Sequence, residues 1–337
     1  MQGALLLDAG PFAHNGESIT MSAKAGFSAV CTETISLSDG RSPWWNIYRQ
    51  GNTLYNCSKW SDIPYRQWAD AEIPFAKQEG ATVIATVGMH AEDAKEIIPA
   101  LNGSGADGIK VVSYYEEDMP TLVSIARRST NLPVWAKISS NWRDPIAVAK
   151  RCLEHGADAL VAMDSVGPVR FFHEGSYPAL NSHADKYWMS GESIHARALA
   201  LVSHLSEETG APVIGVGGVM DAEGVRRMSA CGAAAVGLCS AVIIHGLGRV
   251  SEILQTLQGL APMHPNFDDW EGDAKISLDG TVCTRCGECV RHCGYLALRS
   301  VDGKILINTS ACRRCGLCVQ HCKVGAITVA PAEPSEI

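Results

Sequence analysis

Short apolar segments alternate with amphipathic stretches along residues 1–246, and this alternation limits the folds open to the chain. The apolar segments have the length and composition of buried strands. The eight expected strands are Ala4–Asp8, Ala29–Thr34, Thr82–Val87, Gly108–Val112, Val134–Ile138, Ala159–Met163, Val213–Val216 and Ala234–Leu238. Helical patterns lie between them, as in Pro145–His155 and Ile194–Thr209. Eight strand–helix units predict an α/β fold of the TIM (β/α)8 barrel type, with a doubly wound sheet as the alternative.

The predicted barrel occupies residues 1–260, with a last helix over Arg249–Gly259. A connector over residues 261–280 contains Pro262 and Pro265, and is expected to be a linker rather than a core element. A small domain is predicted over residues 281–330.

Eight of the thirteen cysteines fall between Cys283 and Cys322 in two runs with the same spacing. Each run reads Cys-x2-Cys-x2-Cys-x3-Cys, the spacing of bacterial ferredoxins, so the small domain is expected to be an α+β ferredoxin domain with two [4Fe–4S] clusters. Three closely spaced thiolates wrap one cluster, and the fourth reaches the other. The predicted ligands are Cys283, Cys286, Cys289 and Cys322 for one cluster, and Cys312, Cys315, Cys318 and Cys293 for the other.

Zinc is the alternative occupant of these cysteines, because Cys-x2-Cys pairs also bind zinc. A zinc site uses four ligands and has no need of a third Cys-x2-Cys step. Gly294 and Lys323 stand where ferredoxins usually have proline, but that proline ligates nothing. The sequence therefore favours iron–sulfur clusters.

A group that converts single electrons into two-electron chemistry is expected in the barrel, and flavin is the obvious candidate. Gly215-Val216-Gly217-Gly218 ends the seventh predicted strand, and Cys239-Ser240-Ala241 ends the eighth. The loops after strands seven and eight are where TIM barrels bind phosphate. The glycine run alone also fits a tight turn, but its pairing with Ser240 favours a flavin phosphate site.

The order of these motifs resembles the FMN barrels of dihydroorotate dehydrogenase and dihydropyrimidine dehydrogenase. Leu7-Asp8-Ala9-Gly10-Pro11 is similar to the family's Leu-Ala-Ser-Gly-Pro, and Ala29–Thr34 to its Thr-Lys-Thr strand. Lys137 matches the lysine that holds the flavin pyrimidine edge. The fusion of this barrel to a two-cluster ferredoxin domain is similar to the C-terminal half of dihydropyrimidine dehydrogenase. The resemblance implies FMN binding by Ala9, Gly10, Thr32, Asn56, Lys137, Asp164, Ser190, Gly191, Gly217, Gly218, Cys239 and Ser240.

Three departures from the family pattern concern the substrate. Glu33 replaces the lysine of Thr-Lys-Thr. Val112–Glu116 replaces Asn-x-Ser-Cys-Pro and contains neither asparagine nor cysteine, and Asp164-Ser165 replaces an Asn-Thr pair. Reversal of charge near the flavin disfavours an anionic substrate. The expected substrate is therefore not orotate or uracil, but a neutral or cationic molecule.

Hydride exchange at a C=C or C=N bond also needs a proton donor. Tyr115 takes roughly the place of the family's base and is the first candidate, followed by Glu33 and Tyr114, with His14 and His173 behind them. The alternatives are a packing role for Tyr115 and a structural ion pair for Glu33. The aromatic stretch from Trp44 to Trp60 fits either a substrate wall or a subunit interface.

The composition restricts the partners. A net charge of −8 argues against a nucleic-acid partner. No apolar run approaches the roughly 18 residues of a membrane span, and no secretion signal is visible. Clustered cysteines in odd total number indicate metal ligation in a reducing cytoplasm.

These observations together predict a cytoplasmic oxidoreductase that acts on a small molecule through FMN and two [4Fe–4S] clusters. Electrons are expected from a ferredoxin, a flavodoxin or a separate NAD(P)H-oxidising subunit, and an assembly of like or unlike subunits is expected. The alternative is an electron-transfer scaffold subunit whose barrel has lost its chemistry.

Overall fold

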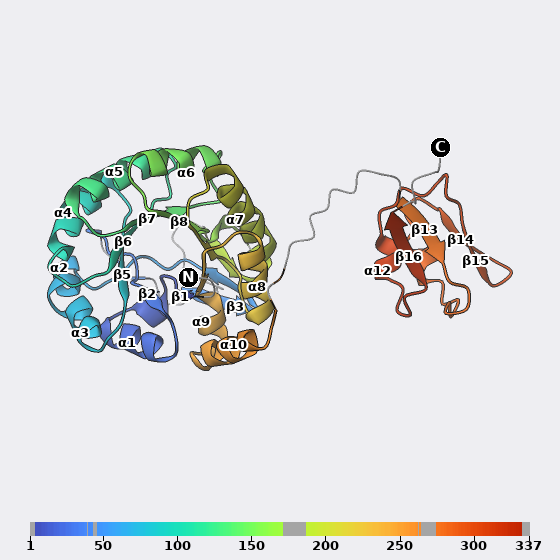
Figure 1. The fold of residues 1–337 in the computed structure, drawn as a ribbon, viewed down its shortest axis with the longest axis horizontal. Helices are drawn as coiled ribbons and strands as arrows, with labels where there is room; N and C mark the ends of the chain where they lie inside the picture. The colour runs from blue at the N-terminus through green and yellow to red at the C-terminus, as the bar shows by residue number, and fades with distance from the viewer. Residues whose placement is uncertain are drawn as a thin grey trace. The chain divides into compact units, whose positions relative to one another are not determined.

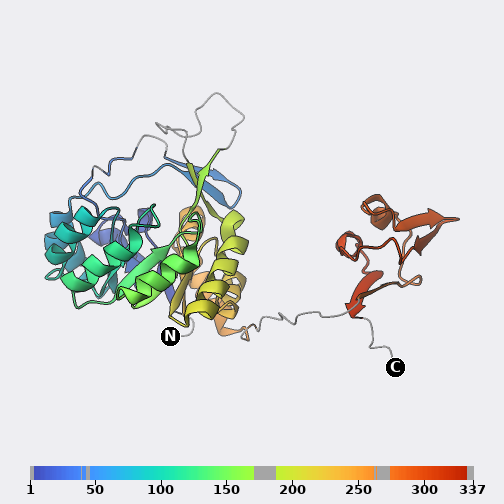
Figure 2. The same cartoon turned by 90° about the horizontal axis from the view of Figure 1, so that it is seen from above.

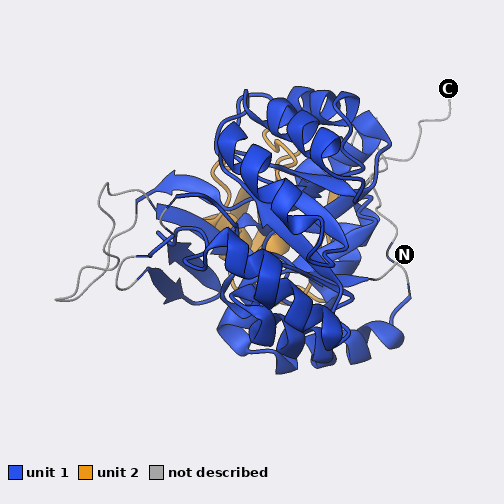
Figure 3. Ribbon diagram, turned by 90° about the vertical axis from the view of Figure 1, so that its left-hand side faces the viewer, with its two compact units in different colours: residues 1–265 blue, residues 266–337 orange. Residues whose placement is uncertain are grey.

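The computed structural model describes residues 4–38, 40–42, 46–170, 187–261, 263 and 274–331. Two compact units, Met1–Pro265 and Asn266–Ile337, make up the chain (Figure 3). Among the described helices, none combines the length and apolar character needed to cross a membrane.

The first unit is a closed barrel of eight parallel strands with its helices in a ring outside (Figure 1). All eight strands coincide with the predicted segments, so the TIM-barrel prediction is confirmed. The strands are β1 (Leu5–Leu7), β2 (Ala29–Cys31), β5 (Val83–Val87), β6 (Gly108–Val111), β7 (Val134–Ile138), β8 (Ala159–Ala162), β11 (Val213–Val216) and β12 (Ala235–Leu238). Closure comes from the pairing of β1 with β12.

Alternate residues of each strand face the outer helices and the barrel interior, as the two-residue period of a strand requires. On β5, Val83, Ala85 and Val87 join the core beneath the helices. Ile84 belongs to a second apolar cluster made by interior-facing strand residues, including Leu6 and Ile214. The interior is thus packed rather than open, and the site must lie at one of its ends.

The main helices follow the predicted alternation. They are α1 (Gly16–Lys24), α3 (Ile73–Gln78), α4 (Ala91–Leu101), α5 (Met119–Ser129), α6 (Pro145–Glu154), α7 (His195–Thr209), α8 (Ala222–Ala230) and α10 (Gly248–Gln258). Shorter turns are η1 (Pro11–Ala13), α2 (Tyr65–Gln67), η2 (Trp68–Glu72), η3 (Glu192–Ile194) and α9 (Ser240–His245). Side-chain oxygens of Asn15, Asp144 and Asp221 cap α1, α6 and α8.

A second sheet, which the sequence did not predict, projects from one end of the barrel (Figure 2). Its order is β3 (Ile47–Gln50), β4 (Thr53–Asn56), β10 (Tyr187–Gly191) and β9 (Val166–Val169). The pairing of β4 with β10 sets Asn56 opposite Trp188 and Leu54 opposite Ser190. Part of the aromatic stretch therefore forms a β-hairpin of β3 and β4, while Trp44 and Trp45 lie outside the described residues.

The second unit contains two small antiparallel sheets and two short helices. Strand β13 (Ala274–Leu278) pairs with β16 (Ile327–Pro331), and β14 (Leu298–Val301) with β15 (Lys304–Ile307). The helices are α11 (Glu288–Arg291) and α12 (Leu317–Gln320). This arrangement confirms the α+β prediction.

Strand β13 falls inside the segment that was expected to be a linker. Its Ile276 and Leu278 pack against the small core around Cys289 and Cys318. These two residues alternate with Lys275 and Ser277, which is the pattern of a half-buried strand. The linker prediction is therefore wrong for this part of the segment, although the sequence carried a local signal for the strand.

Candidate functional site

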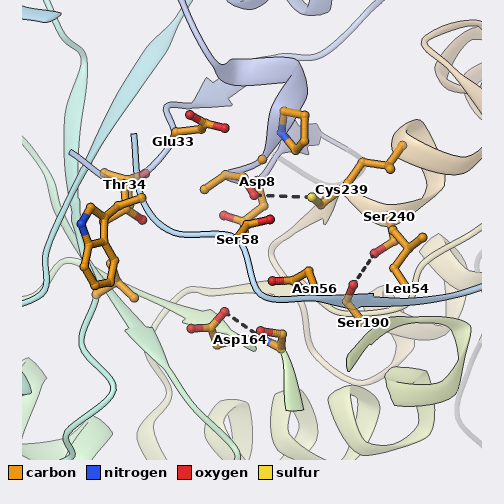
Figure 4. Close-up of a pocket in the computed structure, with 18 of the residues that line it drawn as sticks. Asp8, Glu33, Thr34, Leu54, Asn56, Ser58, Asp164, Ser190, Cys239 and Ser240 are labelled. Carbon is orange, nitrogen blue, oxygen red and sulfur yellow. Dashed lines mark hydrogen bonds between the residues drawn. The ribbon is translucent and has the colours of Figure 1, made fainter. Parts of the chain in front are cut away.

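The main cavity of the barrel unit has a volume of about 670 Å3. It is lined by residues at the carboxyl ends of the strands, by the β3–β4 hairpin and by the segment that follows it. Asn56, at the end of β4, and Ser58, just after it, lie along this part of the wall (Figure 4). Its size is in the range typical of cofactor and small-molecule sites. The active sites of TIM barrels lie at this end of the strands.

Four charged side chains form a buried network at this cavity. Lys137 of β7 donates from Nζ to Asp8 Oδ2 at 2.9 Å and lies 3.2 Å from Asp164 Oδ1. Asp8 follows β1 and also accepts a hydrogen bond at Oδ1 from Lys110 of β6. Lys110 is fully buried, whereas Asp8, Lys137 and Asp164 line the cavity.

The charges in this network hold one another ionised. Burial alone raises the pKa of Asp8, but Lys110 and Lys137 together bring that pKa well below its usual value. Burial alone lowers the pKa of Lys137, but Asp164 and Asp8 raise it well above its usual value. The cavity therefore presents a fixed ammonium group between two carboxylates.

Two predicted glycine segments meet at the end of β11. Gly218 has φ +66°, and a Cβ built there would lie 2.5 Å from the Gly191 carbonyl oxygen and 2.9 Å from the backbone nitrogen of His195. His195 also forms a hydrogen bond of 3.0 Å through Nδ1 to the carbonyl oxygen of Gly217, to which it donates. Only a residue without a side chain permits this close approach.

Two serines that were predicted for the cofactor lie next to each other although they come from distant segments. Ser240, the first residue of α9, donates from Oγ to Oγ of Ser190 on β10 at 3.1 Å (Figure 4). Both line the cavity together with Gly217 and Gly218. This group supplies hydroxyls and glycine backbone at the place predicted for phosphate.

The ends of β1 and β12 are also closely packed. A Cβ on Gly10 would lie 2.8 Å from Cys239 Sγ, and this thiol donates to the carbonyl oxygen of Ala9 at 3.4 Å. Burial raises the pKa of Cys239 to about 12. Cys239 is therefore a neutral packing group at the cavity wall rather than a nucleophile.

Two predicted cofactor residues do not line the cavity. Thr32 is fully buried, donates from Oγ1 to the Glu33 carbonyl oxygen at 2.8 Å and accepts from the Thr86 amide at 2.9 Å. Gly191 packs with its carbonyl oxygen against Gly218, where a Cβ would lie 2.5 Å from that oxygen. Both residues shape the backbone of the site.

Glu33 lines the cavity well away from the Ser190–Ser240 pair (Figure 4). Its Oε2 lies 3.7 Å from His14 Nδ1. Burial raises the pKa of Glu33, and nearby Asp62 acts in the same direction while His14 opposes it. A desolvated carboxyl group is thus held at the end of the cavity opposite to the serines.

The two candidate tyrosines differ in position. Tyr114 lines the cavity, and its ring stacks on Trp188 with 5.3 Å between centroids. Burial, with a further contribution from Asp164, raises the pKa of Tyr114 to about 12. Both tyrosines are partly exposed, but Tyr115 stacks on His90 at 6.1 Å and is not among the residues that line the cavity. His173 lies outside the described residues.

The second unit has two small cavities, each lined by four cysteines. One is lined by Cys283, Cys286, Cys289 and Cys322, and the other by Cys293, Cys312, Cys315 and Cys318. Within the described residues, no three Cys, His, Asp or Glu side chains converge on a point that could hold a single metal ion. Cubane clusters bind each thiolate to a different iron atom, so four thiols around a cavity suit them.

The two halves of this unit repeat each other's backbone. Gly287 and Gly316 have φ of +76° and +74°, and precede α11 and α12. His292 and His321, at the ends of these helices, stack with 3.6 Å between ring centroids. The cysteine repeat is therefore a structural repeat as well.

The fold and its sites define a class of protein: a TIM barrel with a polar cavity at the carboxyl ends of its strands, joined to a small cysteine-rich unit of the ferredoxin type. Residues 87–260, about half of the chain, match the family model for dihydroorotate dehydrogenase. Residues 275–323 match the model for a 4Fe-4S dicluster domain. The chain belongs to the dihydroorotate dehydrogenase family, and this confirms the resemblance.

Curated relatives include proteins named dihydroorotate dehydrogenase B (NAD(+)), catalytic subunit. The protein from Methanosarcina mazei is 33% identical over 197 residues, which cover 54% of this chain and 62% of the relative. The protein from Saccharolobus solfataricus is 33% identical over 137 residues, 41% of this chain and 46% of the relative. The protein from Thermoplasma acidophilum is 26% identical, over 76% of this chain and 89% of the relative. The chain thus spans less than two thirds of the length of the first two relatives.

Sequence reasoning missed three residues of the site: Asp8 as an ion-pair partner, Lys110 and His195. A signal existed for Lys110, because a lysine inside the apolar segment Gly108–Val112 has to be paired if the strand is buried. For His195, which follows the predicted Ser190-Gly191 step, the sequence carried no comparable signal.

Proposed function

We propose that the chain is an FMN- and iron–sulfur-dependent oxidoreductase that reduces, or in reverse oxidises, a C=C or C=N bond of a small molecule. The observation that carries this proposal is the convergence, in one cavity, of ten cofactor residues expected from separate parts of the sequence. They are Ala9, Gly10, Asn56, Lys137, Asp164, Ser190, Gly217, Gly218, Cys239 and Ser240.

The residues of the cavity suit FMN. Lys137 offers an ammonium group for the electron-rich edge of the flavin ring, and the hydroxyls of Ser190 and Ser240 with the Gly217–Gly218 backbone suit the phosphate. When bound, FMN supplies hydride exchange with a substrate and single-electron exchange with iron–sulfur clusters.

We propose two [4Fe–4S] clusters in the second unit, with ligands exchanged between the two cysteine runs. The first cluster takes Cys283, Cys286, Cys289 and Cys322, and the second takes Cys312, Cys315, Cys318 and Cys293. The support is that each proposed set lines its own cavity.

Among the three proton-donor candidates, position in the structure favours Tyr114 and Glu33 over Tyr115. Tyr114 carries its proton at neutral pH, as an ordinary tyrosine does, and burial raises its pKa further, to about 12. Glu33 is desolvated, and its raised pKa suits proton exchange. Tyr115 has no described contact with the cavity.

The substrate is proposed to be neutral or cationic, and to be neither orotate nor uracil. The relatives are named for dihydroorotate, whose oxidation product carries a carboxylate. In this chain a carboxyl group, Glu33, stands where the family has a lysine, and the burial that raises its pKa also disfavours further anionic charge beside it. A second anion in the partly desolvated region around Glu33 would cost further free energy.

Electrons are proposed to come from a ferredoxin, a flavodoxin or a separate NAD(P)H-oxidising subunit, within an oligomeric assembly. The relatives' name includes the words catalytic subunit, which supports a partner of some kind. The proposed cytoplasmic location rests on the cysteine pattern, because clustered cysteines in odd total number favour metal ligation in a reducing compartment.

Anaerobic purification with flavin, iron and sulfide quantified tests this function. About eight iron atoms and one FMN per chain are expected. Zinc at about two atoms per chain, with no flavin, would contradict it. Flavin that no alkene or imine in a substrate screen reoxidises would instead support the alternative of an electron-transfer scaffold.

A further inference from the structure

The charged network at the cavity continues into the barrel interior, beyond the residues that a cofactor can touch. Lys110 is 0% exposed and is not among the cavity-lining residues. Its ammonium group contacts Asp8, which in turn contacts Lys137. The order of groups is therefore Lys110, Asp8, Lys137 and Asp164, with alternating charge.

Stability alone does not account for a buried lysine at this position. Replacement of a buried ion pair by well-packed apolar residues is often neutral or stabilising. Other interior-facing strand positions of the barrel, such as Ile84 and Val161, are apolar. Asp8 also stands where the family segment Leu-Ala-Ser-Gly-Pro has alanine.

We propose that Asp8 and Lys110 are positioning residues that hold the Lys137 ammonium group in place and set the reduction potential of the flavin. This inference rests on the proposed binding of FMN. Asp8 offsets one of two lysine charges, and Lys110 offsets the charge of Asp8. Reduction adds electron density to the flavin, so a more positive surrounding favours the reduced form, and burial makes each charge effective.

The test measures the two-electron midpoint potential of the FMN in the intact chain by anaerobic spectroelectrochemical titration. Asp8→Asn removes a negative charge, and we expect the equilibrium constant for reduction to rise at least tenfold, which is about 30 mV for a two-electron couple. Lys110→Met removes a positive charge and should shift the potential by at least that amount in the opposite direction. The double variant D8N/K110M should lie between the single variants, near the wild-type value.

The control is Lys150→Met, which breaks an exposed ion pair with Glu208 on the outer surface and should leave the potential unchanged. If D8N loses its flavin, the double variant still decides the matter, because its potential should return from the lowered K110M value toward the wild-type value. Flavin bound at an unchanged potential in K110M, or shifts of the same sign in both single variants, would overturn this inference alone. Absence of flavin from the wild-type chain would overturn the proposed function and this inference with it.

Discussion

Among single side chains, Glu33 is the one proposed to restrict what the cavity accepts. Glu33 is a partly buried carboxyl group at the position where the family has the lysine of Thr-Lys-Thr. Sequence comparison located this departure correctly, because a charge reversal inside a recognisable motif is visible without a structure. The raised pKa of Glu33 depends on burial and on Asp62, which only the fold brings near.

Glu33→Lys should restore binding of an anionic ligand. We expect the dissociation constant for orotate, followed by flavin absorbance, to fall about tenfold or more relative to wild type, because a cation replaces a carboxyl group. Glu33→Gln, which removes only the charge, should give an intermediate value. Equal orotate affinity in all three proteins would show that Glu33 does not govern the choice of substrate.

Tyr114→Phe should slow substrate reduction while leaving FMN content unchanged. Loss of a positioned proton donor typically costs about 10²- to 10⁴-fold in rate, and the reoxidation of reduced flavin by the substrate found in the screen measures it. Tyr115→Phe is the matched control, because that ring stacks on His90 away from the cavity. A larger loss for Tyr115→Phe would reverse the proposed roles.

At the scale of elements, the sequence predicted the eight barrel strands but not the β3–β4–β10–β9 sheet. The barrel strands are mostly apolar on both faces, and several follow a helix that ends at a glycine, so they carry local signals. Strands β4 and β10 are separated by more than a hundred residues of chain. Both contain polar as well as apolar residues, most of which are only half buried. Their pairing is a long-range contact of the tertiary structure, and local sequence patterns do not predict it.

Gly218→Ala should loosen the loop between β11 and α8 and weaken FMN binding. The added methyl group would meet the Gly191 carbonyl oxygen at 2.5 Å at a position with φ +66°. We expect FMN affinity, measured on apoprotein by fluorescence titration, to fall about tenfold or more.

Gly210→Ala is the control for this glycine. It ends α7 with φ +62°, but a methyl group added there would have no atom within 4 Å, so it carries the same backbone strain without the contact. Equal losses of FMN affinity in the two variants would assign the effect to backbone strain alone.

The exchange of ligands between the two cysteine runs can be tested by pairing alanine substitutions. Cys283→Ala and Cys322→Ala are expected to affect the same cluster, so the double variant should retain about four iron atoms, as each single variant does. The double variant C283A/C312A should lose both clusters. If C283A/C322A instead loses nearly all its iron, each run ligates its own cluster and the proposed exchange is wrong.

For the whole molecule, the order of motifs predicted both the barrel and the ferredoxin-like unit, because each depends on spacing that the chain displays directly. The buried network of Asp8, Lys110, Lys137 and Asp164 was not predictable in this way, since it joins four different strand ends across the barrel. The sequence identifies which charged side chains are present, but the closure of the sheet into a barrel determines which of them come into contact.

The central claim is that one chain holds a two-electron carrier and two one-electron carriers. An anaerobic reductive titration of the purified protein, with flavin and cluster absorbance followed together, tests it most directly. We predict uptake of about four electrons per chain, two by the flavin and one by each cluster. Uptake of about two electrons with no flavin signal, or no uptake at all, would contradict it.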